Sequence, residues 1–324
     1  MMYFYVRINL NANRQGHYLK PGSDHGGLHA PPYETQCRFF HCKTVVRTRN
    51  EMKLNTPITR RRALSLLGTA TCLPMIHAAR AADTRRLRIG IMAGEDEDLW
   101  RVIVANAAKE GLDLSIMTFS DYNTPDEALA EHEIDANAFQ HGPFLQAQIA
   151  ARGYDIVAVG NTYFSPIGLY SARWKSVADL PRNAVIGLPN DPSNEGRALH
   201  LLEALGLIRL PASAGLLPTP LDIADNPRNL TFHELDAGIV GRSLPDLDAA
   251  VVNTNWALKA GIDLQKQKIG QESLQDNPYV NFIAVNAADA KAPWVTPLVN
   301  AVHQPSTRTA IETIFHGSVV PAWT

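Results

Sequence analysis

Strand-like and helix-like segments alternate along the chain from Leu87 onward, and this alternation constrains the fold more than any other feature. Apolar runs typical of strands are separated by amphipathic or proline-started segments typical of helices. The strand-like runs lie at 87–92, 112–119, 134–139 and 156–159. Repeated strand–helix units of this length predict a mostly parallel sheet with helices on both faces. Ligands of such sheets bind beyond the carboxyl ends of the strands, so the loops there are candidate sites.

A second alternating region, from about residue 166 to residue 252, predicts a second lobe, and a length of 324 residues is enough for two. We expect the chain to cross between the lobes near 160–162 and again near Asn253. Residues 87–162 plus 255–324 would then form lobe 1, and residues 163–254 would form lobe 2. The expected fold class is therefore α/β, with two lobes joined by two crossings around a ligand cleft.

The first 81 residues differ from the rest. Residues 1–51 are rich in His, Arg, Asn and Gly without a sustained period, and we interpret them as a non-native extension. The basic cluster Arg60–Arg62, the apolar run 63–76 and a small-residue end predict an export signal peptide over 52–81. The apolar run is shorter than the roughly 20 residues that span a bilayer. We expect cleavage before Ala82.

The cysteines support an exported protein. Cys37, Cys42 and Cys72 all precede the expected cleavage site, so the mature chain would contain none. This excludes disulfides, thiol catalysis and cysteine–metal sites in the mature protein. We expect no metal and no cofactor.

The expected location is the periplasm, and membrane anchoring through Cys72 stays open. Thr69-Ala70-Thr71 before Cys72 match a lipoprotein signal poorly, whereas residues 59–64 resemble a twin-arginine signal. A net charge of −2 and a pI of about 6.6 leave no basic surface for nucleic acid. These values favour a small-molecule partner.

One stretch, residues 189–197, predicts an anion site. Asp191 followed by Pro192 is typical of a helix start. Asn194 and Arg197 are three residues apart, so they share a helix face near free backbone N–H groups that favour an anion. A carboxylate or a phosphate would fit there. The alternative is a surface helix with a solvated Arg197.

Several segments in one order resemble the substrate-binding proteins of bacterial methionine ABC importers, the NlpA-type lipoprotein family. These segments are 139–144, 152–155 with 159–162, 166–171, 189–197, 252–255 and 278–281. The resemblance extends from about Leu87 to the closing Trp323. It implies a two-lobe periplasmic-binding-protein fold that closes on an amino acid and docks onto a membrane permease, without chemistry on the ligand.

The resemblance also implies a wall around the ligand side chain. Tyr122, Phe139, His141 and Phe144 match this part of the family pattern. Phe144 departs from the family's usual tyrosine, which keeps an apolar wall but removes a possible hydrogen bond. The alternative for the aromatic residues is plain core packing, and for His141 a structural role.

At the other end of the ligand, the resemblance implies that Asn194 and Arg197 bind an α-carboxylate, with two charge-assisted bonds from the guanidinium. Asn253 would present its amide oxygen to the α-ammonium or its nitrogen to the carboxylate. Asn255 is a neighbour that could instead cap the helix of Trp256.

The sequence thus predicts a periplasmic substrate-binding protein that binds L-methionine or a close analogue and delivers it to an ABC importer permease in the inner membrane. No catalytic residue is expected. One alternative is the same family with another apolar amino acid or a small sulfur compound as ligand. Another is an exported enzyme on this scaffold, although the mature chain lacks cysteine, G-x-S-x-G, H-E-x-x-H and a phosphate loop.

Overall fold

The computed structural model of the chain describes residues 86–275 and 277–323, which belong to one compact unit. The expected extension over 1–51, the signal peptide over 52–81 and Cys72 lie outside the described residues. None of the described helices combines the length and the apolar character needed to cross a bilayer.

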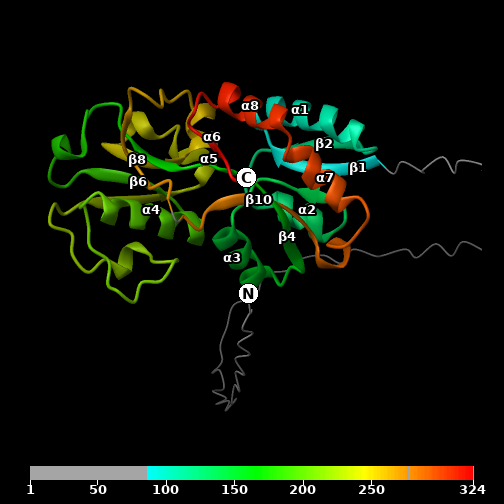
Figure 1. The fold of residues 1–324 in the computed structure, drawn as a ribbon. Helices are drawn as coiled ribbons and strands as arrows, with labels where there is room; N and C mark the ends of the chain where they lie inside the picture. Colours follow the sequence, from blue (N-terminus) through cyan, green and yellow to red (C-terminus); the bar gives the residue numbers. More distant parts are fainter. Residues whose placement is uncertain (1–85, 276, 324) are drawn as a thin grey trace, which may run out of the picture. The chain divides into compact units, whose positions relative to one another are not determined.

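The first sheet has six strands in the order β11-β4-β10-β3-β1-β2 (Figure 1). The strands are β1 Arg86–Met92, β2 Asp113–Phe119, β3 Ala136–Asn137, β4 Ile156–Phe164, β10 Val280–Asn286 and β11 Val320–Pro321. The helices are α1 Glu95–Lys109, α2 Thr124–Ala130, α3 Gly142–Arg152, α7 Val295–Val302 and α8 Pro305–Ile314. Helices α1, α7 and α8 share one apolar core with the sheet, and α2 and α3 share another.

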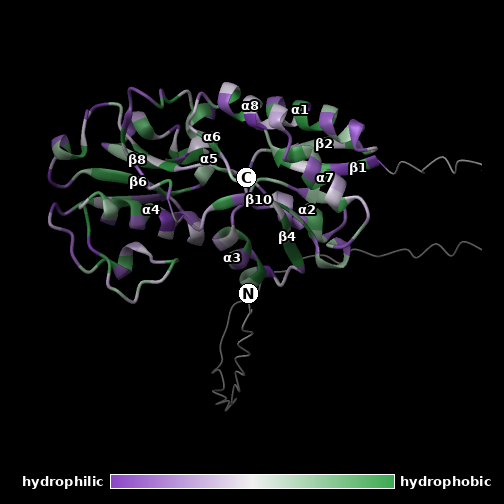
Figure 2. Cartoon of the chain, in the orientation of Figure 1, coloured by the Kyte–Doolittle hydropathy of each residue, from purple (hydrophilic) through white to green (hydrophobic). Residues whose placement is uncertain are grey.

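The second sheet has five strands in the order β7-β6-β8-β5-β9. Its strands are β5 Ile167–Tyr170, β6 Val185–Pro189, β7 Thr231–Leu235, β8 Ala249–Asn253 and β9 Lys268–Gln271. Its α-helices are α4 Pro192–Ala204, α5 Ala237–Val240 and α6 Thr254–Lys259. Short 3-10 helices lie at Val177–Asp179, Pro220–Asp222, Leu244–Asp246 and Ala287–Asp289. The strands β4, β6 and β8 are largely hydrophobic, whereas α1 alternates hydrophobic and hydrophilic residues (Figure 2).

The first sheet is mixed: β1 to β4 run in the same direction, as the sequence predicted, but β10 lies between β3 and β4 and is antiparallel to both. Strands β1, β2 and β3 are parallel to one another, as are β6, β7 and β8. These strands are linked by helical crossovers, which place successive strands in the same direction. Strands β4, β5, β9, β10 and β11 pair antiparallel with their neighbours. Of these, β4 and β10 lie in the segments that leave and re-enter the first sheet, so they run in opposite directions.

The return crossing also lies later than the sequence predicted. Strand β9 pairs with β5 in the second sheet, and Trp256 of α6 packs with Val240 and Val252 of the same lobe. The second sheet therefore extends to Gln271, beyond the expected boundary at residue 254. The chain returns between β9 and β10. Strand β4 extends to Phe164, beyond the expected run 156–159. The first crossing therefore follows Phe164.

Candidate functional site

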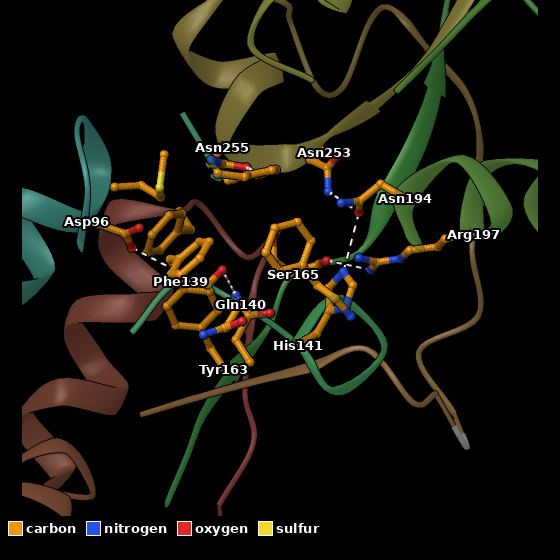
Figure 3. A pocket seen from close by; sticks show the side chains of 15 residues that line it. Asp96, Phe139, Gln140, His141, Tyr163, Ser165, Asn194, Arg197, Asn253 and Asn255 are labelled. Atoms are coloured by element: carbon orange, nitrogen blue, oxygen red, sulfur yellow. Dashed lines mark hydrogen bonds between the residues drawn. The ribbon is translucent and has the colours of Figure 1, made fainter. Parts of the chain in front are cut away.

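A pocket between the two lobes contains residues from both sheets (Figure 3). All seven site residues expected from the sequence line it; they are Tyr122, Phe139, His141, Phe144, Asn194, Arg197 and Asn253. The cavity volume is about 30 Å³.

The helix that carries the polar end of the pocket begins as the sequence predicted. Asp191 caps α4, because its side chain accepts a hydrogen bond from the Asn194 backbone N–H at 3.0 Å, and Pro192 is the first helical residue. One turn further on, Asn194 and Arg197 are both buried and both line the cavity.

The Arg197 guanidinium is held by residues of the two crossing segments. Its Nε donates to Glu272 Oε2 at 3.0 Å, and its Nη2 donates to Glu272 Oε1 and to the Ser165 carbonyl. The Tyr279 ring lies 4.3 Å from the guanidinium carbon. Glu272 therefore makes the forked pairing that the sequence assigned to a ligand carboxylate. Among the described residues no hydrogen bond uses Nη1.

A chain of side-chain amides fixes the neighbouring groups. Asn194 Oδ1 accepts from Asn253 Nδ2 at 2.9 Å and lies 3.3 Å from His141 Nε2, while Asn194 Nδ2 donates to both oxygens of Asp191. His141 Nδ1 accepts the Phe144 backbone N–H, which caps α3, so the proton of a neutral ring is on Nε2. Burial and the nearby Arg197 charge lower the pKa of His141 to about 3, so the ring is neutral at physiological pH.

Asn253 has one free hydrogen-bonding atom. Its nitrogen is engaged by Asn194, whereas its Oδ1 is buried and has no partner among the described residues. A buried acceptor without a partner costs about 1 to 3 kcal/mol, which a ligand donor would recover. The sequence left two roles open for Asn253: its amide oxygen could accept from an α-ammonium, or its nitrogen could donate to a carboxylate. Because the nitrogen is engaged, this geometry favours the oxygen as acceptor. Asn253 also occupies the N-cap position of α6, so Asn255 lies inside that helix and is not its cap.

The opposite end of the pocket is aromatic. The rings of Tyr122, Phe139 and Phe144 lie 5.7 to 5.9 Å apart, centre to centre, in tilted or edge-on pairs. Trp256 extends this group at 5.6 Å from Tyr122. The Tyr122 hydroxyl donates to Asn255 Oδ1 at 2.8 Å, and burial raises the pKa of Tyr122, so the hydroxyl keeps its proton.

The structure adds lining residues that sequence reasoning missed. Asp96 lines the pocket, although nothing in the sequence patterns singled it out. Gln140 lies between two expected residues, and its buried Oε1 has no partner among the described residues. Its position after β3 could have identified it. Glu272 contacts Arg197 without lining the cavity, and it had no such signal because it lies on the return crossing that the sequence misplaced. Tyr279, which also contacts Arg197, belongs to the segment 278–281 that carried the family resemblance. No cluster of His, Cys, Asp and Glu in the described ranges could hold a metal ion.

Two α/β lobes with mixed sheets, joined by two crossings around this pocket, define the periplasmic substrate-binding class. The chain belongs to the NlpA lipoprotein family, whose model matches residues 87–323. This confirms the resemblance noted in the sequence.

Relatives and solved structures agree with this assignment. The chain is 41% identical over 244 residues to the D-methionine-binding lipoprotein MetQ of Escherichia coli O157:H7, covering 74% of this chain and 90% of the relative. A nutrient-binding protein from Burkholderia cenocepacia bound to methionine superposes with a TM-score of 0.71 at 47% identity, covering 73% of this chain and all of that one. An ABC transporter periplasmic substrate-binding protein from Coxiella burnetii superposes with a TM-score of 0.70 at 44% identity, with the same coverage.

Proposed function

We propose that this chain is the substrate-binding protein of an ABC importer and that its ligand is methionine. The observation that carries the proposal is the pocket itself, where a buried guanidinium and an unpartnered amide oxygen lie beside an aromatic wall. A free α-amino acid with an apolar side chain has groups complementary to all three. The names of the Escherichia coli and Burkholderia cenocepacia proteins support methionine as that amino acid.

In the proposed pose, the ligand carboxylate accepts from Arg197 Nη1 near the first turn of α4. The α-ammonium donates to Asn253 Oδ1, which otherwise stays unpaired. The thioether lies among Tyr122, Phe139 and Phe144, because sulfur makes favourable contacts with the edges of aromatic rings. His141 donates from Nε2 to Asn194 Oδ1 and so helps to hold the amide network in place.

The preferred enantiomer is part of the test. The sequence predicts L-methionine as the ligand, whereas the Escherichia coli relative is named for D-methionine. The two enantiomers differ by the exchange of two substituents at Cα, whereas the protein groups that would bind the carboxylate and the ammonium keep the same positions. Both enantiomers must therefore be titrated separately.

The proposal includes binding without chemistry on the ligand and a permease in the inner membrane as partner. The Coxiella burnetii structure, described as part of an ABC transporter, supports this role. Periplasmic location would follow from the signal peptide expected over 52–81. Recovery of chemically unchanged ligand from the purified protein would separate this function from that of an exported enzyme.

The test is calorimetric titration of protein purified from the periplasm of a bacterial host, with both enantiomers of methionine. We expect one ligand per chain and an increase in Tm with ligand, because a ligand specific to the folded state stabilises it by mass action. The same thermal-shift assay with a panel of amino acids tests the rival ligand classes. A shift with another amino acid and none with methionine would refute the proposed ligand.

A further inference from the structure

The ring of Tyr279 contacts one pocket residue from each lobe. Its centre lies 4.3 Å from the guanidinium carbon of Arg197, which belongs to α4 of lobe 2. It lies 5.0 Å from the ring of His141, which precedes α3 of lobe 1, in an edge-on pair. Only 5% of Tyr279 is exposed, and it does not line the cavity itself. Any effect of Tyr279 on a ligand must therefore act through the residues that it touches.

The Arg197 guanidinium is restrained by the ring as well as by hydrogen bonds. Glu272 Oε2 accepts from its Nε at 3.0 Å, and the Ser165 carbonyl accepts from its Nη2 at 2.9 Å. The guanidinium carbon also lies over the face of the Tyr279 ring, where the electrons of the ring attract a cation. Together the carboxylate, the carbonyl and the ring leave little freedom to Nη1, the nitrogen that the proposed pose gives to the ligand carboxylate.

Tyr279 is itself held by the chain that returns from lobe 2. Its backbone N–H donates to Asn277 Oδ1 at 2.9 Å, and Asn277 Nδ2 donates to the Ser273 carbonyl at 3.0 Å. Ser273 follows Glu272, whose Oε1 accepts the backbone N–H of Ile167 at the start of β5 at 2.6 Å. The carboxylate and the ring that contact the guanidinium are thus tied to each other through Asn277. This arrangement fixes where the ring lies.

We propose that Tyr279 is a positioning residue for the ligand carboxylate: its ring holds Arg197 so that Nη1 faces the ligand, and it thereby sets the preference of the site for a carboxylate over an uncharged group. Tyr279 directly precedes β10 of lobe 1, so this contact also joins the lobes. The inference rests on the proposed function, because it takes the same pose of the carboxylate at Arg197.

The test is calorimetric titration with methionine and with methionine amide, which keeps the ammonium and the side chain but lacks the carboxylate charge. Tyr279→Leu removes the ring. Tyr279→Phe keeps the ring and removes only the hydroxyl, which hydrogen-bonds no described residue. The matched control is Phe282→Leu, because Phe282 is 6% exposed and its ring packs with α2 and α3 instead of Arg197.

We expect Tyr279→Leu to weaken methionine binding about tenfold, the size of a buried cation–π contact, and amide binding by less than about threefold. Tyr279→Phe should keep the wild-type preference for methionine over the amide, because the ring is still present. Phe282→Leu should keep that preference as well. If Tyr279→Leu does not fold, Tyr279→Met fills more of the space without a ring and is read in the same way.

Four outcomes would overturn the inference. Equal losses for methionine and the amide in Tyr279→Leu would show that the ring only supports the fold, and unchanged methionine affinity would show that Arg197 is oriented without it. Loss of the preference in Tyr279→Phe would assign the effect to the hydroxyl. Its loss in Phe282→Leu would mean that any buried ring nearby has this effect. Failure of the proposed function would differ, because the wild type would then bind neither methionine nor its amide.

Discussion

The two ends of the pocket are built differently. At the polar end, protein partners already orient the groups: Glu272 and Ser165 hold Arg197, and Asp191 holds Asn194. At the aromatic end, rings pack in tilted or edge-on pairs, and two hydroxyls donate hydrogen bonds, Tyr122 to Asn255 and Tyr163 to Asp96. Orienting polar groups before binding lowers the entropy cost of binding. The polar end thus suits the α-carboxylate and the α-ammonium, which all free α-amino acids share. The aromatic end suits the side chain, which differs from one amino acid to another.

At the polar end, the positive charge of Arg197 is balanced by a carboxylate of the protein. Glu272 neutralises Arg197 inside the protein, and His141 is neutral. A zwitterionic amino acid would therefore add no net charge to this buried site. In the proposed pose, Glu272 and the ligand carboxylate would share the guanidinium.

The largest expected effect comes from removing the Arg197 side chain at the polar end. Arg197→Ala should weaken methionine binding by roughly 2 to 5 kcal/mol, because it removes the carboxylate partner and leaves the ligand charge unpaired. Calorimetric titration measures the change. Arg101→Ala is the control, since its side chain is 74% exposed and its surface pair contributes little. Unchanged affinity in Arg197→Ala would exclude the carboxylate role.

Removing Arg197 also leaves Glu272 buried without its cation, which should lower the free energy of unfolding. The double variant Arg197→Ala with Glu272→Gln separates the two consequences. It should regain part of the lost stability in urea unfolding but none of the lost affinity. Recovery of affinity would mean that Glu272 repels the ligand in the single variant.

The next effect concerns two buried groups, Asp96 and His141, which burial keeps neutral by shifting their pKa values in opposite directions. Burial raises the pKa of Asp96 from 3.8 to about 7, so between these values the unfolded chain has lost a proton that the folded chain keeps. Stability should therefore fall as pH rises through that window, by up to about 4 kcal/mol, and change no further above it. His141, with a pKa lowered to about 3, contributes stability that rises between about pH 3 and 6.5.

Asp96→Asn isolates the first contribution because it leaves His141 in place. Urea unfolding from about pH 4 to pH 8 should show the variant gaining stability relative to the wild type as pH rises, with a plateau above about pH 7. Asp98→Asn is the matched exposed control. A wild-type to variant difference that does not vary with pH would mean that Asp96 is ionised throughout.

A smaller effect tests the unpartnered oxygen at the polar end. Asn253→Ala should weaken methionine binding by about 1.5 to 3 kcal/mol, the range for a hydrogen bond to a charged group. An analogue of methionine without the ammonium should lose less, and this difference isolates the ammonium contact from the lost bond to Asn194. Equal losses for both ligands would place the ammonium elsewhere.

The smallest effect belongs to the aromatic end. Phe144→Tyr should change methionine affinity by less than about 1 kcal/mol, because Phe144 lines the cavity and a hydroxyl adds one polar atom at its edge. Titration of both enantiomers checks this. Complete loss of binding would show that the rings around Phe144 have no room for the added oxygen.

Much of the site followed from local patterns. Asp191-Pro192 predicts the helix start, and the three-residue spacing then places Asn194 and Arg197 on one face, because both depend on a few consecutive residues. Strand ends likewise pointed to Phe139, His141 and Asn253. The sheets were predicted less well, since strand direction and the return crossing depend on pairing between distant segments.

The sequence by itself determined the strand–helix alternation, the start of α4 that places Asn194 and Arg197 on one face, and the family to which the chain belongs, because these depend on short-range patterns and ordered motifs. Only the tertiary structure decided which groups meet. Glu272 reaches Arg197 from 75 residues away, and Tyr163 reaches Asp96 from 67 residues away. No local propensity encodes such pairs, since they form only when two sheets and both crossings are packed around one buried pocket.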